Sequence, residues 1–178
     1  MTAEASRKVR RFVDLCDTFH LPVIAFVDEP GFMIGLRAEQ AATIRFGAEA
    51  MFAVVQSTVP WATVLVRKTY GVAGAAHIAP DAHILAWPSA EAGALPVEGG
   101  VAVAFRREIA NAHDPDAKRR ELEASFEAGR SPFPRAEGFG IHDLIDPRRT
   151  RPVLCDWLDW SEPRLSQHRG ERHYSIRP

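Results

Sequence analysis

The stretch that decides the fold of this chain is Thr63–Ala79, with the sequence TVLVRKTYGVAGAAHIA. Its first four residues are apolar or β-branched, which is typical of a buried strand. Gly71 and Gly74 follow within a short segment that is otherwise rich in alanine. We therefore predict a buried strand, a tight loop and the first turns of a helix.

This junction is the first candidate for a functional site. The first N–H groups of a helix have no internal partner and carry the positive end of the helix dipole, so they can stabilise a developing oxyanion. The alternative is that Gly71 and Gly74 only allow the strand and the helix to pack closely. The stretch by itself leaves both interpretations open.

The bulk composition is that of one globular domain. The chain has 178 residues, of which 46% are hydrophobic and 25% are charged. A net charge of −1 and a pI near 6.7 give no electrostatic reason to expect nucleic acid or a membrane surface as a partner. We expect one domain that binds neither.

Two cysteines, Cys16 and Cys155, both lie in apolar helical patterns, where a free thiol behaves as a small buried hydrophobe. This pattern predicts a reducing compartment. No apolar run approaches the ~20 residues of a membrane span, and the N-terminus has no uninterrupted apolar segment of a secretory signal. We expect a cytoplasmic protein.

Short strands and helices alternate along the chain, which indicates an α/β architecture. Before the central stretch we expect an amphipathic helix over 2–19 capped by Thr2, a strand over 23–27 covered on both faces, a loop over 28–35 and one long helix over 36–57. After it we expect a strand over 83–87, a short strand or turn over 92–95, helices over 101–112 and 116–128, a connection over 129–140, an extended piece over 141–146 and a last helix opened by Pro147.

The sequence contains few side chains that indicate catalysis. His77 and His83 lack further metal ligands at useful spacing, and nucleophile-elbow, Walker and dinucleotide motifs are absent. His77 is interpreted as a packed or capping residue rather than an acid or base, and Asp28 as a side chain that holds the amides of its loop. What remains is two backbone loops at strand ends, which suits chemistry that needs oxyanion stabilisation.

Several segments, in order, resemble one known family. They are Val27-Asp28-Glu29-Pro30-Gly31-Phe32-Met33-Ile34-Gly35, Ile44-Arg45-Phe46-Gly47-Ala48, Val59-Pro60, Arg67-Lys68-Thr69-Tyr70-Gly71, Ala86-Trp87-Pro88-Ser89-Ala90, Glu98-Gly99-Gly100-Val101 and Phe105-Arg106-Arg107-Glu108-Ile109. Their order and spacing are similar to the C-terminal half of the carboxyltransferase (β) subunit of biotin-dependent acyl-CoA carboxylases, the propionyl-CoA, acetyl-CoA and methylcrotonyl-CoA group.

This resemblance implies a crotonase-like (ClpP/crotonase) fold of repeated strand–strand–helix units. It implies transfer of a carboxyl group to the α-carbon of an acyl-CoA from carboxybiotin, which a separate carrier holds. The backbone N–H groups of Val72 and Ala73 would polarise the biotin ureido oxygen. The resemblance also places Gly31, Phe32, Gly71, Gly74 and Ala75 in the biotin or substrate cleft, and it implies no metal.

The chain departs from the family in two respects. Members usually have glycine at the position of Val72. Valine keeps the backbone N–H donor, but its branched side chain narrows the space through which a ligand reaches that N–H. We also expect an N-terminally truncated domain over 1–160, with a polar, basic tail over 161–178. Such a domain should expose a sheet edge and an apolar helix face around Met51–Val55.

The resemblance implies partners: an N-terminal carboxyltransferase half or other copies of the subunit, a biotin carboxylase and a biotin carrier protein, in an oligomer. Two other functions stay open, namely a fragment of a biotin-dependent acyl-CoA decarboxylase α subunit and a non-catalytic assembly module of the same fold. The acyl chain, the number of subunits and activity of the chain alone are not encoded in any motif that we recognise.

Overall fold

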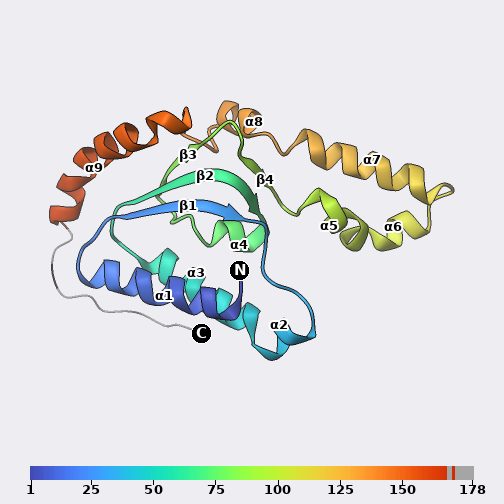
Figure 1. The fold of residues 1–178 in the computed structure, drawn as a ribbon, viewed down its shortest axis with the longest axis horizontal. Helices are drawn as coiled ribbons and strands as arrows, with labels where there is room; N and C mark the ends of the chain where they lie inside the picture. Colours follow the sequence, from blue (N-terminus) through green and yellow to red (C-terminus); the bar gives the residue numbers. More distant parts are fainter. Residues whose placement is uncertain (168–169, 171–178) are drawn as a thin grey trace.

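The computed structural model describes residues 1–167 and 170 of the chain. A parallel sheet lies between helices α1 and α3 on one face and α9 on the other, while α5, α6 and α7 extend to one side (Figure 1). The elements are α1 (Ala3–Thr18), β1 (Val23–Glu29), α2 (Leu36–Gln40), α3 (Thr43–Gln56), β2 (Trp61–Tyr70), α4 (Gly71–Ala75), β3 (His83–Ala86), β4 (Glu91–Gly93), α5 (Val97–Ala104), α6 (Arg106–Ala110), α7 (Pro115–Ala128), α8 (Pro132–Glu137), β5 (Asp143–Leu144), a 3₁₀ turn (Pro147–Arg149) and α9 (Thr150–Gln167).

The sheet has the order β1-β2-β3-β5, and every ladder in it is parallel. The last residues of β2 pair with β4 instead of β3. Because parallel strands end at the same edge, Glu29 at the end of β1 lies opposite Thr69 near the end of β2. The α/β prediction is confirmed, and β3, β4 and α5 follow one another in the order strand, strand, helix.

β2 is the centre of the core because its side chains are buried on both faces. Trp61 packs with Val13 and Val54 from the helical layer of α1 and α3. On the opposite face, Ala62 and Val64 pack with Leu154 and Trp157 of α9. Burial on both faces explains the near-continuous apolar sequence of this strand.

The first helix agrees with its prediction, including the cap, since the Thr2 hydroxyl accepts the N–H of Ala5 at 3.1 Å. Its predicted apolar face is only partly buried: Val13 and Cys16 are covered, whereas Phe12 and Phe19 are exposed. Cys155 is also exposed, so the prediction that both thiols are buried is wrong for that residue.

Two predicted helices are each divided in two. The helix expected over 36–57 breaks between α2 and α3, where Ala42 takes a left-handed φ of 56° that a helix cannot contain. The helix expected over 101–112 begins earlier, at Val97, and breaks at Phe105. The apolar pattern runs through both breaks, so it does not mark them.

The prediction that strand 23–27 is covered on both faces is wrong. Val23 and Val27 are buried, but Ile24 is 40% exposed and Phe26 57% exposed. The cause is that α9 packs over β2 and β3 rather than over β1. The expected apolar helix face is confirmed, because Phe52 and Val55 of α3 are exposed.

The C-terminal part is more helical than expected. The connection predicted over 129–140 contains α8, and β4 overlaps the strand or turn expected over 92–95 but begins one residue earlier, at Glu91. α9 continues to Gln167 with Pro163 inside it, so the first residues of the predicted tail are helical. The rest of that tail, apart from Gly170, lies outside the described residues, and the division at 160 stays a prediction.

Asp114 caps the exposed helix α7, as its carboxylate accepts the N–H of Ala117 at 2.9 Å. We expect Asp114→Ala to lower the free energy of unfolding by about 1 kcal/mol, because one N-terminal amide loses its acceptor. Urea unfolding followed by circular dichroism measures this. Asp114→Asn keeps the acceptor and should cost less; an equal loss in both variants would contradict the cap as the cause.

Candidate functional site

The predicted junction lacks its tight loop. β2 extends to Tyr70, and α4 begins at the next residue with Tyr70 as its N-cap. The strand is longer than its apolar run because its last residues pair with β4, which no local pattern reveals. α4 therefore starts directly at the carboxyl end of the central strand, where parallel sheets present their ligand sites.

Both glycines of the junction are required by the local structure. Gly71 has a φ of +59°, and a Cβ built on it would lie 3.1 Å from the Ala94 carbonyl oxygen. A Cβ on Gly74 would lie 2.9 Å from the carbonyl carbon of Thr69. The packing interpretation is thus confirmed for Gly74, which lets α4 lie close to β2, whereas Gly71 is favoured by its left-handed φ and by its approach to the Ala94 carbonyl after β4. The oxyanion hypothesis stays open.

The two predicted backbone donors differ in exposure. Val72 is 57% exposed, whereas Ala73 is buried. Both lie in the first turn of α4, where N–H groups have no partner within the helix. Ala75 is exposed at the other end of this short helix. The oxyanion role of Val72 and Ala73 stays a prediction.

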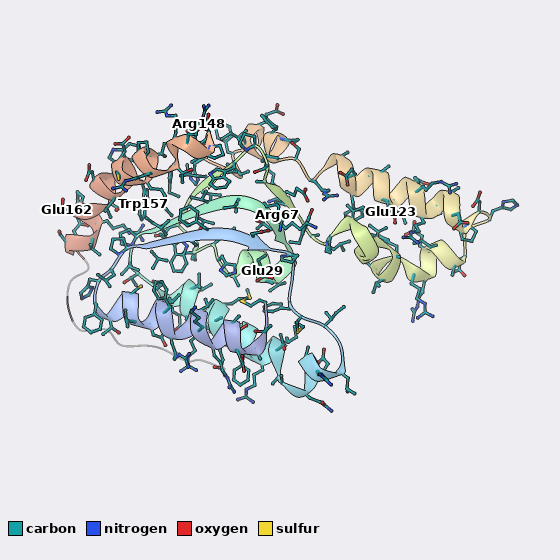
Figure 2. The ribbon with its side chains drawn as sticks, viewed as in Figure 1. Glu29, Arg67, Glu123, Arg148, Trp157 and Glu162 are labelled. Atoms are coloured by element: carbon teal, nitrogen blue, oxygen red, sulfur yellow. The ribbon has the colours of Figure 1, made fainter. Side chains whose placement is uncertain are left out.

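Gly31 and Phe32 follow β1 at the same edge of the sheet, and the labelled residues Glu29 and Arg67 mark this edge in Figure 2. The Glu29 carboxylate accepts the N–H of Gly31 at 3.2 Å. The Phe32 ring packs against Gly47 of α3, within 2.5 Å of the point where a Cβ would be. The carboxyl ends of β1 and β2 thus lie at the same end of the sheet, but the Phe32 side chain is directed toward α3.

Asp28 does not hold the amides of its own loop, so that interpretation is wrong. Its carboxylate accepts the N–H of Lys68 at 3.1 Å and the Nε–H of Arg67 at 3.2 Å, both from β2. The hydrogen bond from Arg67, with a further one from the Lys68 backbone, holds the pKa of Asp28 below its usual value. Asp28 therefore ties the ends of β1 and β2 together.

A polar network that the sequence analysis missed supports the start of α4. The Tyr70 hydroxyl donates to Glu91 of β4 at 2.9 Å, and Arg130 forms an ion pair with the same carboxylate. Burial, followed by the Glu91 carboxylate, raises the pKa of Tyr70 to about 12. These residues lie far apart in the sequence, so spacing gives no signal for the network.

The raised pKa of Tyr70 predicts a loss of stability at alkaline pH. In the unfolded chain the phenol ionises near its ordinary pKa of 10.0, whereas the folded chain keeps the proton until about pH 12. The unfolded state thus binds fewer protons in this window, and the free energy of unfolding falls as pH rises from 10 to about 12. Denaturant unfolding against pH tests this; Tyr70→Phe should flatten that slope, and an unchanged slope would contradict it.

His77 is a packed residue, as predicted. Its carbonyl oxygen accepts from Trp61 Nε1 at 3.1 Å and Thr63 Oγ1 at 2.9 Å, and burial lowers the pKa of its ring. Within residues 1–167 and 170, no group of three or more His, Cys, Asp or Glu side chains could hold a metal ion. In the same part of the chain, every helix is too short or too polar to cross a membrane.

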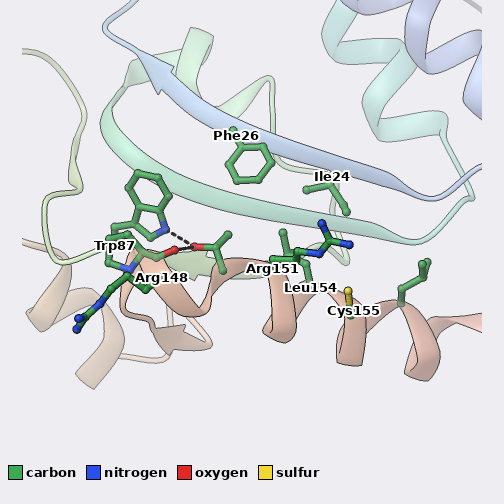
Figure 3. Close-up of a pocket in the computed structure, with 10 residues that line it drawn as sticks. Ile24, Phe26, Trp87, Arg148, Arg151, Leu154 and Cys155 are labelled. Atoms are coloured by element: carbon green, nitrogen blue, oxygen red, sulfur yellow. Dashed lines mark hydrogen bonds between the residues drawn. The ribbon is translucent and has the colours of Figure 1, made fainter.

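Two cavities lie along β1, and none of the seven predicted site residues lines either one. A cavity of about 540 Å³ separates β1 from α9, as Figure 3 shows, with Ile24 and Phe26 facing Leu154 and Cys155. A second, of about 400 Å³, lies between β1 and α1. Ile24 and Phe26 of β1, which line both cavities, are exposed. The sequence analysis expected this strand to be covered on both faces and therefore predicted no cavity along it.

The profile of the Carboxyl transferase domain matches residues 1–173. The chain belongs to this family. The resemblance found in the sequence is therefore confirmed over nearly the whole chain.

One curated relative of this chain is the carboxyltransferase subunit of propionyl-CoA carboxylase from Haloferax mediterranei. It is 36% identical, and the match covers 97% of this chain and 34% of the relative. The methylmalonyl-CoA carboxyltransferase 12S subunit of Propionibacterium freudenreichii subsp. shermanii is 37% identical over 95% of this chain and 33% of the relative. The α subunit of methylmalonyl-CoA decarboxylase from Propionigenium modestum is 30% identical, over 97% and 34%. The chain spans about a third of the length of these proteins.

Solved structures confirm the crotonase-like fold. The transcarboxylase 12S structure, a hexamer with methylmalonyl-coenzyme A and methylmalonic acid bound, superposes with a TM-score of 0.79 at 35% identity, over 100% of this chain and 34% of that one. The β subunit of P. aeruginosa geranyl-CoA carboxylase has a TM-score of 0.83 at 19% identity, over 99% and 35%, which speaks for the fold alone.

Proposed function

We propose that this chain is part of an acyl-CoA carboxyltransferase, which moves a carboxyl group from carboxybiotin to the α-carbon of an acyl-CoA and for which this chain supplies the biotin side of the site. The observation that carries the proposal is family membership over residues 1–173, combined with a helix that starts at the end of the central strand. Relatives at 36% and 37% identity are carboxyltransferase subunits.

The role of the chain's residues follows from α4. The N–H groups of Val72 and Ala73 would donate to the ureido oxygen of biotin, because they belong to the first turn of the helix and have no intrahelical acceptor. The exposed position of Val72 fits a ligand that arrives from outside. The neighbouring site residues have no side chain or a small one and so leave space beside these N–H groups; they are Gly31, Gly71, Gly74 and Ala75. Biotin, held by a separate carrier, would supply the carboxyl group.

We propose an acyl-CoA as the acceptor, since the transcarboxylase 12S structure contains methylmalonyl-coenzyme A. That neighbour is described as a hexamer, which supports an oligomer for the complete enzyme. Other subunit copies or the remaining carboxyltransferase half, a biotin carboxylase and a biotin carrier protein are the proposed partners. A cytoplasmic location agrees with two cysteines that are both free thiols.

A second candidate is biotin-dependent decarboxylation of an acyl-CoA. The observation that favours it is the 30% identical α subunit of methylmalonyl-CoA decarboxylase. The same donors would serve both directions, because they stabilise negative charge on biotin in either case.

The test is decarboxylation of methylmalonyl-CoA in the presence of a soluble biotin derivative, measured as CO₂ release. The chain is assayed alone and together with the part of the 12S subunit that it does not span. Turnover only with the added polypeptide supports the proposal. Turnover by the chain alone would refute the assignment of one side of the site, and no turnover in either assay would favour a non-catalytic module.

A further inference from the structure

The side chain of Tyr70 is held where β2 passes into α4. Tyr70 is 1% exposed and is the N-cap residue of α4. It pairs in register with Gly93 of β4, and a Cβ built on Gly93 would lie 3.4 Å from Tyr70 Cε1. The ring therefore packs against β4, where the lack of a side chain at Gly93 leaves room for it. Its hydroxyl reaches Glu91, two residues back along the same strand, at 2.9 Å.

The end of β4 also meets the first residue of α4. Gly71 has a left-handed φ of +59°, and a Cβ built on it would lie 3.1 Å from the Ala94 carbonyl oxygen. Ala94 directly follows β4. This segment therefore fixes both the residue before α4 and the first residue of that helix. The direction of the next N–H groups, those of Val72 and Ala73, depends on these contacts.

Arg130, which follows α7, holds β4 in place. Its backbone carbonyl accepts the N–H of Ala92 at 3.0 Å, and its guanidinium group forms an ion pair with Glu91. The Arg130 side chain is 13% exposed, whereas the Arg119 side chain, which pairs with Glu123 on α7, is 49% exposed. Because exposed ion pairs contribute little, the pair at β4 is the one expected to fix a geometry.

The charges of this pair also fix the direction of the hydrogen bond from Tyr70. The hydrogen bond from Arg130 holds the pKa of Glu91 below its usual value, so Glu91 is a carboxylate and can only accept. The Tyr70 hydroxyl must then donate, and hydrogen bonds to a charged acceptor are roughly twice as strong as those between neutral groups. The three side chains thus connect the end of α7, through β4, to the start of α4.

We propose that Tyr70, Glu91 and Arg130 are positioning residues, which hold the first turn of α4 so that its N–H groups keep the direction needed to donate to a ligand. This inference rests on the proposed function for the identity of the ligand, but not for the hold on α4. A group that acts by directing a donor changes the rate of the chemical step more than it changes substrate binding.

The first test follows α4 by amide hydrogen exchange of the chain alone, measured by NMR. The N–H of Ala76 donates to the Val72 carbonyl at 2.9 Å, so it reports the first turn, whereas the N–H of Ile145 donates to Ala86 in the core. In Tyr70→Phe, which keeps the ring but loses the hydroxyl, we expect exchange at Ala76 to become about tenfold faster. A loss of global stability alone would speed exchange at Ile145 and leave the local opening of α4 unchanged.

The second test is a double-mutant cycle on methylmalonyl-CoA decarboxylation, in the assay with the complementing polypeptide. Tyr70→Phe and Glu91→Ala should each lower kcat by about tenfold and change KM by less than about twofold. The double variant should lose no more than Glu91→Ala alone, because both changes break the same contact. Glu91→Gln keeps an acceptor oxygen for the Tyr70 hydroxyl and should retain more of kcat than Glu91→Ala.

Arg119→Ala is the matched control, since it removes only the ion pair with Glu123, which is labelled on α7 in Figure 2. It should leave both exchange at Ala76 and kcat unchanged. Unchanged exchange at Ala76 in Tyr70→Phe, or losses of kcat that multiply in the double variant, would overturn the proposal. If the original chain shows no turnover even with the complementing polypeptide, the proposed function fails, and the exchange result alone decides whether the network holds α4.

Discussion

Gly74→Ala is expected to lower the free energy of unfolding by about 2–3 kcal/mol. The added Cβ would lie 2.9 Å from both the carbonyl carbon and the Cγ2 of Thr69. The first of these atoms belongs to the backbone of the central strand, so it cannot move away without disturbing the pairing of Thr69 with Ala92. Either α4 rises from β2 or the ladder is distorted, and urea unfolding at neutral pH measures the cost.

Gly129→Ala is the matched control. Gly129 ends α7 at a φ of −88°, and the nearest atom to an added Cβ is the Phe126 carbonyl oxygen at an ordinary 3.7 Å. The folded state accepts this methyl group, and the loss of backbone freedom in the unfolded chain should raise stability by about 0.4–1 kcal/mol. Opposite signs for the two variants support the close approach at Gly74; a neutral Gly74→Ala would contradict it.

Much of the fold was predictable because it depends on local patterns. The capping hydroxyl of Thr2, the helical period of α1 and the apolar run of β2 each act over a few residues, and the predicted cap, helix and strand are confirmed, although Phe12 and Phe19 of the predicted apolar face are exposed. Pro115 with the preceding Asp114 marked the start of α7 in the same way. Where neighbours in sequence decide the structure, the sequence is sufficient.

The errors arise where distant contacts decide. β2 extends past Val66 because β4 pairs with its end, and Ile24 and Phe26 are exposed because α9 packs elsewhere. Ala42 interrupts a helical pattern with a left-handed backbone that alanine rarely adopts, so no residue type marked the break. An apolar run indicates that a strand can be covered, but the packing of other elements decides whether it is.

The candidate site shows the same division. The glycines at the end of β2 and the loop after β1 were found because turn residues at strand ends give a local signal. The network of Tyr70, Glu91 and Arg130 was not found from the sequence, because it forms only when β2 pairs with β4. Because Tyr70 is the N-cap residue of α4, this network holds the residue that directly precedes the first turn of that helix.

Val72→Pro is expected to reduce carboxyl transfer by about 10²–10³-fold, which is the effect of losing one oxyanion donor. Proline removes the N–H of the second residue of α4, and this N–H makes no hydrogen bond within the helix. The side chain of Val72 is exposed, so the change leaves the core intact. The measurement is the rate of methylmalonyl-CoA decarboxylation with a soluble biotin derivative, in the assay that contains the complementing polypeptide.

Val72→Gly is the matched variant, because it also removes the β-branched side chain but keeps the N–H. It should retain the rate of the original chain or exceed it, since the approach to the donor becomes wider. Thermal unfolding of both variants checks that α4 still forms. If Val72→Pro folded normally and kept its rate within a few fold, the N–H of Val72 could not be the donor, because a lost charge-stabilising hydrogen bond in the transition state must appear in the rate. If both variants lost the rate equally, the valine side chain would carry the effect, and the backbone role at this position would be wrong.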